Sequence, residues 1–302
     1  MKKNHKDTVF ARVKRKKQGY ILMAPYFVLF FTFTVLPVLM AITLSFTSFN
    51  MLQPPKFIGW ENYIRLFLEN EVFMIALQNT LVFAVVTGPV SYVLCFALAW
   101  VINELPPKIR AVMTVVFYAP SISGMVFFIW GYFFSGDRYG LVNGILLRFG
   151  FIDGPINFFR DTDWILPLLL LVQLWLSLGV GFLAFIAGLQ TVDRALYEAA
   201  AVDGIQNRWQ ELWFITLPSM KPQLMFGAVM QITTSFAVAD ISVSLAGLPS
   251  VNYAGETIVT HMMDFGWIRF EMGFASAIAT ILFFMMIGSN KAVQRLLRKV
   301  GT

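Results

Sequence analysis

Six long stretches of this sequence contain no Asp, Glu, Lys or Arg, and they constrain the fold more than any other feature. They are residues 18–55, 72–103, 111–136, 164–192, 222–239 and 272–290. A helix of about 20 apolar residues crosses the hydrocarbon core of a bilayer, because each residue adds about 1.5 Å. The 222–239 stretch reaches this length only by continuing through Asp240.

The composition points the same way. Of the 302 residues, 58% are hydrophobic and only 13% are charged, whereas about 25% are charged in soluble proteins. We therefore predict an all-α integral membrane fold with six transmembrane helices. The predicted spans are residues 21–46, 75–102, 111–134, 165–189, 222–246 and 270–290.

The first span follows a basic segment, as a cleaved signal peptide does. Its apolar run is much longer than the core of about 7–15 residues in a signal peptide, so we expect it to stay in the membrane. The predicted organisation is a basic tail at 1–20, a transmembrane domain at 21–290 and a second basic tail at 291–302.

Lys and Arg are unevenly distributed between the two sides of these spans. Both termini and segments 103–110 and 190–221 fall on one side, which holds 17 of the 23 Lys and Arg residues. Short loops rich in Lys and Arg face the cytoplasm, so both termini are predicted to be cytoplasmic. Contacts with anionic headgroups account for the net charge of +6, and we expect a lipid partner and no nucleic acid.

The sequence lacks the groups that an enzyme or a self-powered transporter needs. His5 and His261 fall on opposite sides of the predicted membrane, and no Gly-Lys pair exists to form a GxxxxGK[ST] phosphate-binding loop. Asp240 is the only ionisable residue well inside a predicted span, whereas proton-coupled pumps usually bury several. The chain is therefore predicted not to be an enzyme, and uphill transport would take its energy from a partner.

The longest predicted cytoplasmic segment, about 190–221, has an unusual pattern. A strong helix former ends at Gly204, and Pro218 and Pro222 close a second helix and open the next span. Between them, one helical stripe is predicted for Ile205, Trp209, Leu212 and Thr216, widened by Trp213. The pattern predicts a helix–turn–helix at the membrane surface.

This segment resembles the cytoplasmic signature of ATP-binding-cassette importer permeases, because Glu-Ala-Ala-x-x-x-Gly at 198–204 precedes Ile-x-Leu-Pro at 215–218. In that family the loop docks on a separate ATPase subunit. The resemblance implies an ATPase-coupling role for Glu198, Ala199, Ala200, Asp203, Gly204, Trp209, Leu217 and Pro218.

The spacing within the signature departs from the family pattern. The family places nine residues between the Gly and the Ile, and ten separate Gly204 from Ile215 here. One extra residue turns a helix by about 100°. Either the turn after Gly204 absorbs the extra residue, or the docking face is rotated.

Other segments are similar to carbohydrate-type permeases of the same family. These are Phe-Ile-Gly-Trp-Glu-Asn-Tyr at 57–63, Asn-Thr at 79–80, Gly-Leu-Val-Asn at 140–143 and Gly-Phe-Ala-Ser-Ala at 273–277. The basic tail and the first span resemble the first of two unlike permease subunits, as in the maltose type. The extra N-terminal spans and large external insertion of that type are absent here, so the shorter glycerol-phosphate and lactose types are the nearer match. The resemblance implies a multi-pass protein of the bacterial cytoplasmic (inner) membrane that forms half of the pathway for a sugar or oligosaccharide.

The same resemblance implies several partners. They are a second permease subunit in a heterodimer, two ATPase subunits and an extracytoplasmic solute-binding protein. This chain is expected to bind no cofactor of its own, because ATP and Mg would be bound by the partner ATPase.

Polar residues inside the spans are the candidates for contact with the solute, because sugar hydroxyls need hydrogen-bonding partners. The predicted substrate-path residues are Gln173, Ser177, Gln231, Thr233, Thr234 and Asp240, with Trp175 to stack on a sugar ring. Hydroxyls in spans also often bond back to their own helix. For Asp240, substrate contact, a salt bridge to another chain and a solvated helix end stay open. Spans four and five are expected to work as a pair, with the others as framework.

Two other functions explain less of the sequence. A self-contained secondary transporter or channel would explain the spans but not the loop, and it would function alone in liposomes. A membrane-embedded enzyme would need converging nucleophiles, bases or metal ligands, and the spans contain none. A permease subunit powered by a separate ATPase accounts for the loop, the orientation and the missing nucleotide site together.

Overall fold

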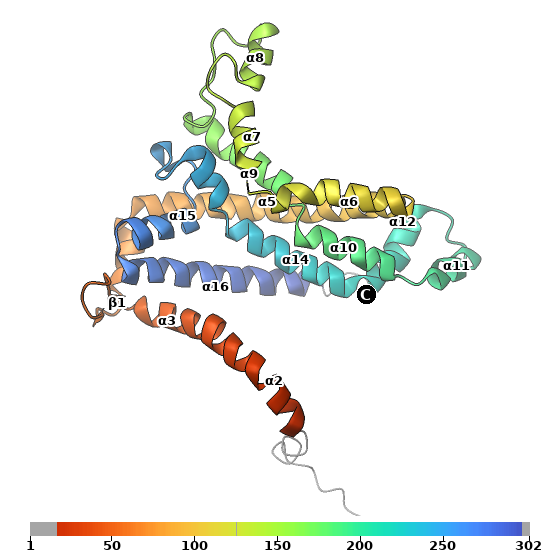
Figure 1. Cartoon of the computed structure of the whole chain (residues 1–302), viewed down its shortest axis with the longest axis horizontal. Coiled ribbons are helices and arrows are strands. Elements are labelled where there is room, and N and C mark those ends of the chain that lie inside the picture. The colour runs from red at the N-terminus through yellow and green to blue at the C-terminus, as the bar shows by residue number, and fades with distance from the viewer. Residues whose placement is uncertain (1–16, 125, 298–302) are drawn as a thin grey trace, which may run out of the picture.

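The computed structural model describes residues 17–124 and 126–297, which form a bundle of helices with one short hairpin (Figure 1). The bundle contains α5 Glu71–Asn103, α6 Pro107–Ile122, α9 Thr162–Leu176, α10 Val180–Thr191, α14 Lys221–Phe236 and α16 Met272–Leu297. The predicted all-α fold is confirmed. The predicted span 75–102 falls within α5, and the predicted span 270–290 lies in α16 from its first residue, Met272, onward.

Among the described residues, four helical segments are long and apolar enough to cross a bilayer, or five if one bent pair counts as a span. They are Gln18–Leu44, Glu71–Asn103, Thr162–Thr191, Met272–Leu297 and the bent pair Pro107–Ile122 with Val126–Phe133. The predicted fifth span does not meet this test, because its helix is short.

The first span is a long helix that meets the bundle only with its second half. It consists of α2 Lys17–Phe30, a π-helical turn η1 Phe31–Val35 and α3 Leu36–Leu44. α3 packs on α16, whereas α2 leans away from the bundle (Figure 1). Apolar side chains are exposed all around α2, as expected for a helix surrounded by lipid. Most of the predicted 1–20 tail, and the end of the 291–302 tail, lie outside the described residues, and α16 continues to Leu297.

The third predicted span, 111–134, is not one straight helix. α6 ends at Ile122, α7 Val126–Phe133 begins four residues later, and the two are bent by 82°. Pro120 removes a backbone donor near the end of α6, and Ser123 takes an extended conformation that closes the helix. The prediction of a single helix here is therefore wrong.

The fourth and fifth predicted spans are also broken. α9 and α10 are separated at residues 177–179, where the backbone of Gly179 is not helical. α14 ends at Phe236, and residues 237–239 are not helical before a π-helical turn, η4 Ser242–Ala246. The prediction of an unbroken helix over 222–246 is wrong, and at the break the Val238 carbonyl accepts a hydrogen bond of 2.6 Å from the hydroxyl of Thr257.

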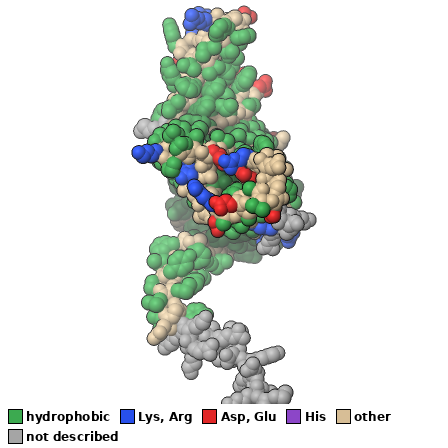
Figure 2. Space-filling view, turned by 90° about the vertical axis from the view of Figure 1, so that its right-hand side faces the viewer, with side chains coloured by type: hydrophobic (Ala, Val, Ile, Leu, Met, Phe, Trp, Pro, Cys, Tyr) green, Lys and Arg blue, Asp and Glu red, His purple; other side chains and the backbone are tan. Residues whose placement is uncertain are grey.

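Charged side chains gather at one end of the bundle. Figure 2 looks onto the end from which α11 Arg194–Val202 and α12 Arg208–Glu211 project, and shows Arg, Lys, Asp and Glu side chains together there. Hydrophobic side chains cover most of the remaining surface in this view. This distribution suits a bundle whose sides face lipid and whose end faces water.

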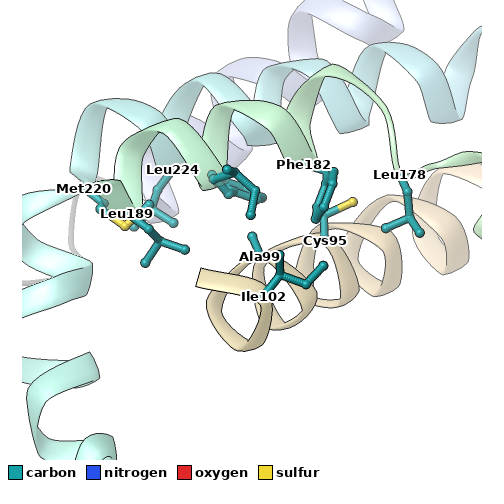
Figure 3. Packing of buried hydrophobic residues seen from close by; sticks show 10 residues of the cluster. Cys95, Ala99, Ile102, Leu178, Phe182, Leu189, Met220 and Leu224 are labelled. Atoms are coloured by element: carbon teal, nitrogen blue, oxygen red, sulfur yellow. The ribbon is translucent and has the colours of Figure 1, made fainter. Parts of the chain in front are cut away.

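α5 is the central helix and packs against α9, α10 and α14. Figure 3 shows Phe182 of α10 and Cys95 and Ala99 of α5 in one buried cluster. Lipid is as apolar as a core side chain, so close van der Waals packing holds such helices together. Gly227 illustrates this packing, because a Cβ there would lie 2.4 Å from the ring of Phe185.

The loops at the other end of the bundle are held by asparagine side chains. The loop elements are β1 Thr47–Ser48, β2 Lys56–Phe57, α4 Glu61–Ile64, η2 Arg65–Glu69, η5 Val251–Tyr253, α15 Ile258–Met263 and η6 Asp264–Ile268. Asn79 donates to the carbonyl oxygens of Ala254 (3.1 Å) and Glu256 (2.9 Å). Asn62 donates to those of Ser45 (2.8 Å) and Thr47 (3.0 Å). These motif residues therefore order the loops that cap the spans.

The structure also explains two other residues of the segments that resemble carbohydrate-type permeases. Asn143, on α8 Leu141–Arg148, donates to the carbonyl oxygens of Ser135 and Ile156 at 2.9 Å each. Gly273 opens α16 against strand β1, where a Cβ would lie 2.0 Å from the Thr47 carbonyl oxygen. Only glycine allows this approach.

Candidate functional site

The breaks in the third, fourth and fifth spans surround one cavity of about 460 Å³, which we call the helix-break cavity. Three helices, α6, α9 and α14, end at its wall, and α7 and α10 begin there. Small-molecule sites typically occupy about 300–1,000 Å³. Irregular backbone at membrane depth is tolerated where it is buried in protein or lines a water-filled cavity, and broken helices often form transport sites.

Most of the predicted substrate-path residues come together in this cavity. Its polar lining consists of Tyr118, Ser121, Ser123, Gln173, Ser177, Gln231, Thr234 and Asp240. Thr233 and Trp175 lie outside the lining. The Thr233 hydroxyl bonds back to the Val229 carbonyl (2.9 Å), and Trp175 packs edge-on against Trp130 with ring centroids 5.4 Å apart.

The third span, which we expected to be framework, also contributes to the cavity. Ser121 and Ser123 flank the end of α6 and line the cavity with the neighbouring Tyr118. The signal that was overlooked is a proline followed by small polar residues and a glycine within an apolar run, which is typical of a helix end.

Gln231 braces the cavity wall. Its buried side-chain nitrogen donates to the carbonyl oxygen of Ser177 (3.1 Å) and contacts the sulfur of Cys95 (3.0 Å). Thr234 and Asp240, in contrast, are exposed at the cavity. These two side chains are therefore better placed than Gln231 to meet a solute.

The 190–221 loop, which is predicted to be cytoplasmic, begins with a helix that is capped at both ends. Asp193 accepts a hydrogen bond from the Ala195 N–H (3.0 Å) at the start of α11. At its end Gly204 has a φ of +93°, and the Ile205 N–H donates to the Ala200 carbonyl (3.0 Å). This is the hydrogen bond of a Schellman motif, which favours glycine at the left-handed position.

The second half of the loop differs from the predicted stripe. After α12 the chain forms a π-helical turn, η3 Leu212–Thr216, and then α13 Leu217–Ser219. Leu212, Ile215 and Thr216 are buried, whereas Trp209 and Trp213 are 71% and 65% exposed. The stripe prediction was wrong for both tryptophans. The π-helical turn shifts the helix face at Trp213, whereas Trp209 precedes that turn.

A π-helical turn holds one more residue than the α-helical turn it replaces. Such a turn lies at Leu212–Thr216, before Leu217 and Pro218, so this stretch offers a second place for the extra residue besides the turn after Gly204. Both Leu217 and Pro218 are half-buried.

Two contacts hold the loop against the bundle. Arg208 pairs with Glu104 at the end of α5 (3.0 Å), and Trp209 packs on Trp100 with ring centroids 5.2 Å apart. A third contact joins the two halves of the loop, since the Tyr197 hydroxyl lies 2.8 Å from that of Thr216. The hydrogen bond that Arg208 donates to Glu211, together with the charge of Glu104, raises the pKa of Arg208 above its usual value.

The signature residues of α11 divide into two groups. Glu198, Ala199 and Asp203 are exposed, as is Gly204, whereas Ala200 is buried. α11 projects beyond the end of the bundle (Figure 1). Its exposed face is therefore available to another protein.

Comparisons with known proteins agree with this architecture. Residues 108–299 match the family model "Binding-protein-dependent transport system inner membrane component". The probable ABC transporter permease protein YesP of Bacillus subtilis is 30% identical over 87% of this chain and 85% of its own length. The lactose transport system permease protein LacF of Rhizobium radiobacter is 33% identical over 70% of each chain.

A solved structure has the same fold. It is a chain of a bacterial ABC transporter involved in the import of the acidic polysaccharide alginate, with a TM-score of 0.77 and 23% identity. The match covers 97% of this chain and 99% of that chain. With the family model matching more than half of the sequence, the chain belongs to the family of binding-protein-dependent transport system inner membrane components.

Proposed function

We propose that this chain is the permease subunit of an ATP-driven importer for a sugar or oligosaccharide. In this proposal it has six spans, with residues 222–246 as a broken fifth span, and lies in the bacterial inner membrane with both termini in the cytoplasm. The relatives support a carbohydrate solute, since one is named for lactose transport and the structural neighbour for alginate import.

The helix-break cavity is this chain's half of the translocation pathway. Its hydroxyl, amide and carboxylate groups offer the partners that sugar hydroxyls need. A second, unlike permease subunit would complete the pathway, and an extracytoplasmic solute-binding protein would deliver the solute. The family's dependence on a binding protein supports the delivery of the solute by such a protein.

The exposed face of α11 is the observation that carries the coupling part of the proposal. Glu198 and Ala199 form a small, charged surface on a capped helix that projects from the bundle end. Small side chains permit close approach of another backbone, and Glu198 offers a charge to a basic partner. Two ATPase subunits, which bind ATP and Mg, would dock on this loop and its counterpart in the sister subunit.

Reconstitution tests the dependence on an ATPase. The purified chain and its sister permease, with the binding protein, should accumulate solute in proteoliposomes only when the ATPase subunits and ATP are present. Uptake without any nucleotide-binding subunit would overturn the proposal and favour a self-contained transporter.

The docking role of α11 is tested by charge reversal. Glu198→Lys should release the ATPase or uncouple ATP hydrolysis from uptake, while membrane insertion and assembly of the permease pair stay unchanged. Asp153→Lys is a matched control, because it makes the same charge change at an exposed position of the predicted outer segment 135–163. Equal ATPase binding by both variants would remove Glu198 from the docking surface.

A further inference from the structure

We propose that Asp240 makes the helix-break cavity repel negative charge, so that the imported solute is a neutral sugar and not an acidic one. The inference rests on the proposed function, because it assumes that the chain transports a solute. It goes further by assigning the charge class of the solute and the residue that selects it. The relatives leave this point open, since their names include both lactose and an acidic polysaccharide.

The first observation is the charge of the lining. Asp240 is the only Asp or Glu that lines the helix-break cavity, and no Lys or Arg of the described chain lines it. Within the described residues the Asp240 carboxylate forms no ion pair. It is also exposed at the cavity, so its charge acts on whatever enters.

The second observation concerns the helix ends. The C-terminal end of a helix carries about half a negative charge, and the N-terminal end about half a positive charge. Three helices (α6, α9 and α14) end at the cavity wall, and three helical segments (α7, α10 and the one that starts at Asp240) begin there. The helix ends at the wall therefore add no net positive charge to offset that of Asp240.

These charges decide which sugars the cavity accepts. A neutral sugar donates its hydroxyl hydrogens to a carboxylate and to helix-end carbonyls, which gives charge-assisted hydrogen bonds. A uronic or sulfonic acid group would instead meet a like charge in a partly water-excluded space, where repulsion is stronger than in bulk water. The cavity thus binds the first class and disfavours the second.

The charge of the cavity can be measured without knowing the solute. Thr234→Cys introduces a thiol at an exposed lining position, and the native Cys95 is fully buried. In the complete transporter, the thiol is modified with a cationic (trimethylammonioethyl) and an anionic (sulfonatoethyl) methanethiosulfonate. Each rate is divided by the rate with free 2-mercaptoethanol, and the chain without the added cysteine gives the background.

The expected ratio of the normalised rates, cationic over anionic, is about tenfold. A unit charge within a Debye length of about 8 Å changes the local concentration of each ion roughly threefold in opposite directions. Asp240→Asn should bring the ratio to within about twofold of one. Tyr139→Cys, at a 90% exposed position of the outer segment, is the control whose ratio Asp240→Asn should leave unchanged.

A ratio near one in the parent would mean that a cation of the sister subunit neutralises Asp240, and would overturn the inference. The solute class is tested separately by thermal shift of the cognate solute-binding protein with neutral trisaccharides (raffinose, maltotriose) and acidic trigalacturonate. Stabilisation by trigalacturonate alone would also overturn it. Neither measurement requires ATP hydrolysis or uptake, so a failure of the reconstitution test above would be recognised independently.

Discussion

The Gln231 side-chain amide donates a hydrogen bond of 3.1 Å to the carbonyl oxygen of Ser177, which joins α14 to the residue where α9 ends. The Gly179 N–H (2.8 Å) and the Cys95 thiol (3.4 Å) donate to the same oxygen. A helix break frees carbonyl oxygens that a continuous helix would use, and membrane proteins must satisfy them internally. The break between α9 and α10 is therefore held open by donors from α5 and α14.

Gln231→Leu should destabilise the permease, because it removes one of these donors while keeping a similar side-chain volume. The expected loss is about 1–2 kcal/mol of unfolding free energy, measured by chemical unfolding of the detergent-solubilised complex. Thr233→Val is the matched control, since that hydroxyl bonds only to the Val229 carbonyl of its own helix and should cost less than about 0.5 kcal/mol. Equal stability of the two variants would refute the bracing role.

The sequence-based prediction succeeded where the signal is continuous along the chain. Charge-free runs predicted the second and sixth spans, because a lipid-exposed helix needs nothing but length and apolar side chains. The cytoplasmic helix α11 was also predictable, since Gly204 ends it by its own conformational preference. Five of the predicted substrate-path residues line one cavity, because polar groups within a span cluster away from lipid.

The helix breaks could not be predicted in the same way. Residues 237–239 contain neither glycine nor proline, and at this break the Val238 carbonyl accepts a hydrogen bond from Thr257, which lies outside the helix. The π-helical turn at Leu212–Thr216 likewise depends on packing, with Leu212 and Ile215 buried on the bundle. Tertiary contacts of this kind override local propensity and leave no local pattern.

Gly204→Ala should destabilise the cytoplasmic loop. Its φ of +93° is strained for any residue with a Cβ, although the space around it is open. We expect a cost of about 1–2 kcal/mol, seen as faster proteolysis within α11 and weaker ATPase binding. Gly288→Ala is the control, because it adds the same methyl group in open space on α16 at an ordinary helical φ and should be neutral or slightly stabilising. Equal proteolysis rates for both variants would contradict the expected strain.

Deletion of Phe214 should be tolerated. Its side chain is 65% exposed and lies in the π-helical turn, so removing one residue converts that turn to an α-helical turn without moving Leu217 and Pro218. Assembly and ATP-driven uptake should stay above about half of the parent level. Deletion of Phe226, also partly exposed but within regular helix α14, should abolish both, because it rotates the following cavity residues by about 100°. Loss of assembly on deleting Phe214 would show that the π-helical turn is not a removable insertion.

Two buried titratable side chains of the predicted outer segment 247–269 change the unfolding free energy in opposite directions as pH rises. Burial raises the pKa of Glu256 to about 7, with a contribution from the charge of Asp264, whereas a Thr260 hydrogen bond and the charge of Arg269 lower it. Burial lowers the pKa of His261 to about 4. Both side chains lie at one pocket together with Asp264 and Arg269, which form an ion pair of 2.7 Å.

The pH dependence of stability should emerge when either group is removed. From about pH 4.3 to 7 the folded Glu256 holds a proton that the unfolded one releases, so unfolding free energy falls as pH rises. From about pH 4 to 6.5 the unfolded His261 holds the extra proton, so unfolding free energy rises with pH. Each pKa shift corresponds to roughly 3 kcal/mol of unfolding free energy, and the two contributions nearly cancel in the parent.

The thermal midpoint of Glu256→Gln should therefore rise between pH 4.5 and 6.5, and that of His261→Gln should fall. Parallel profiles for the two variants would contradict this opposition.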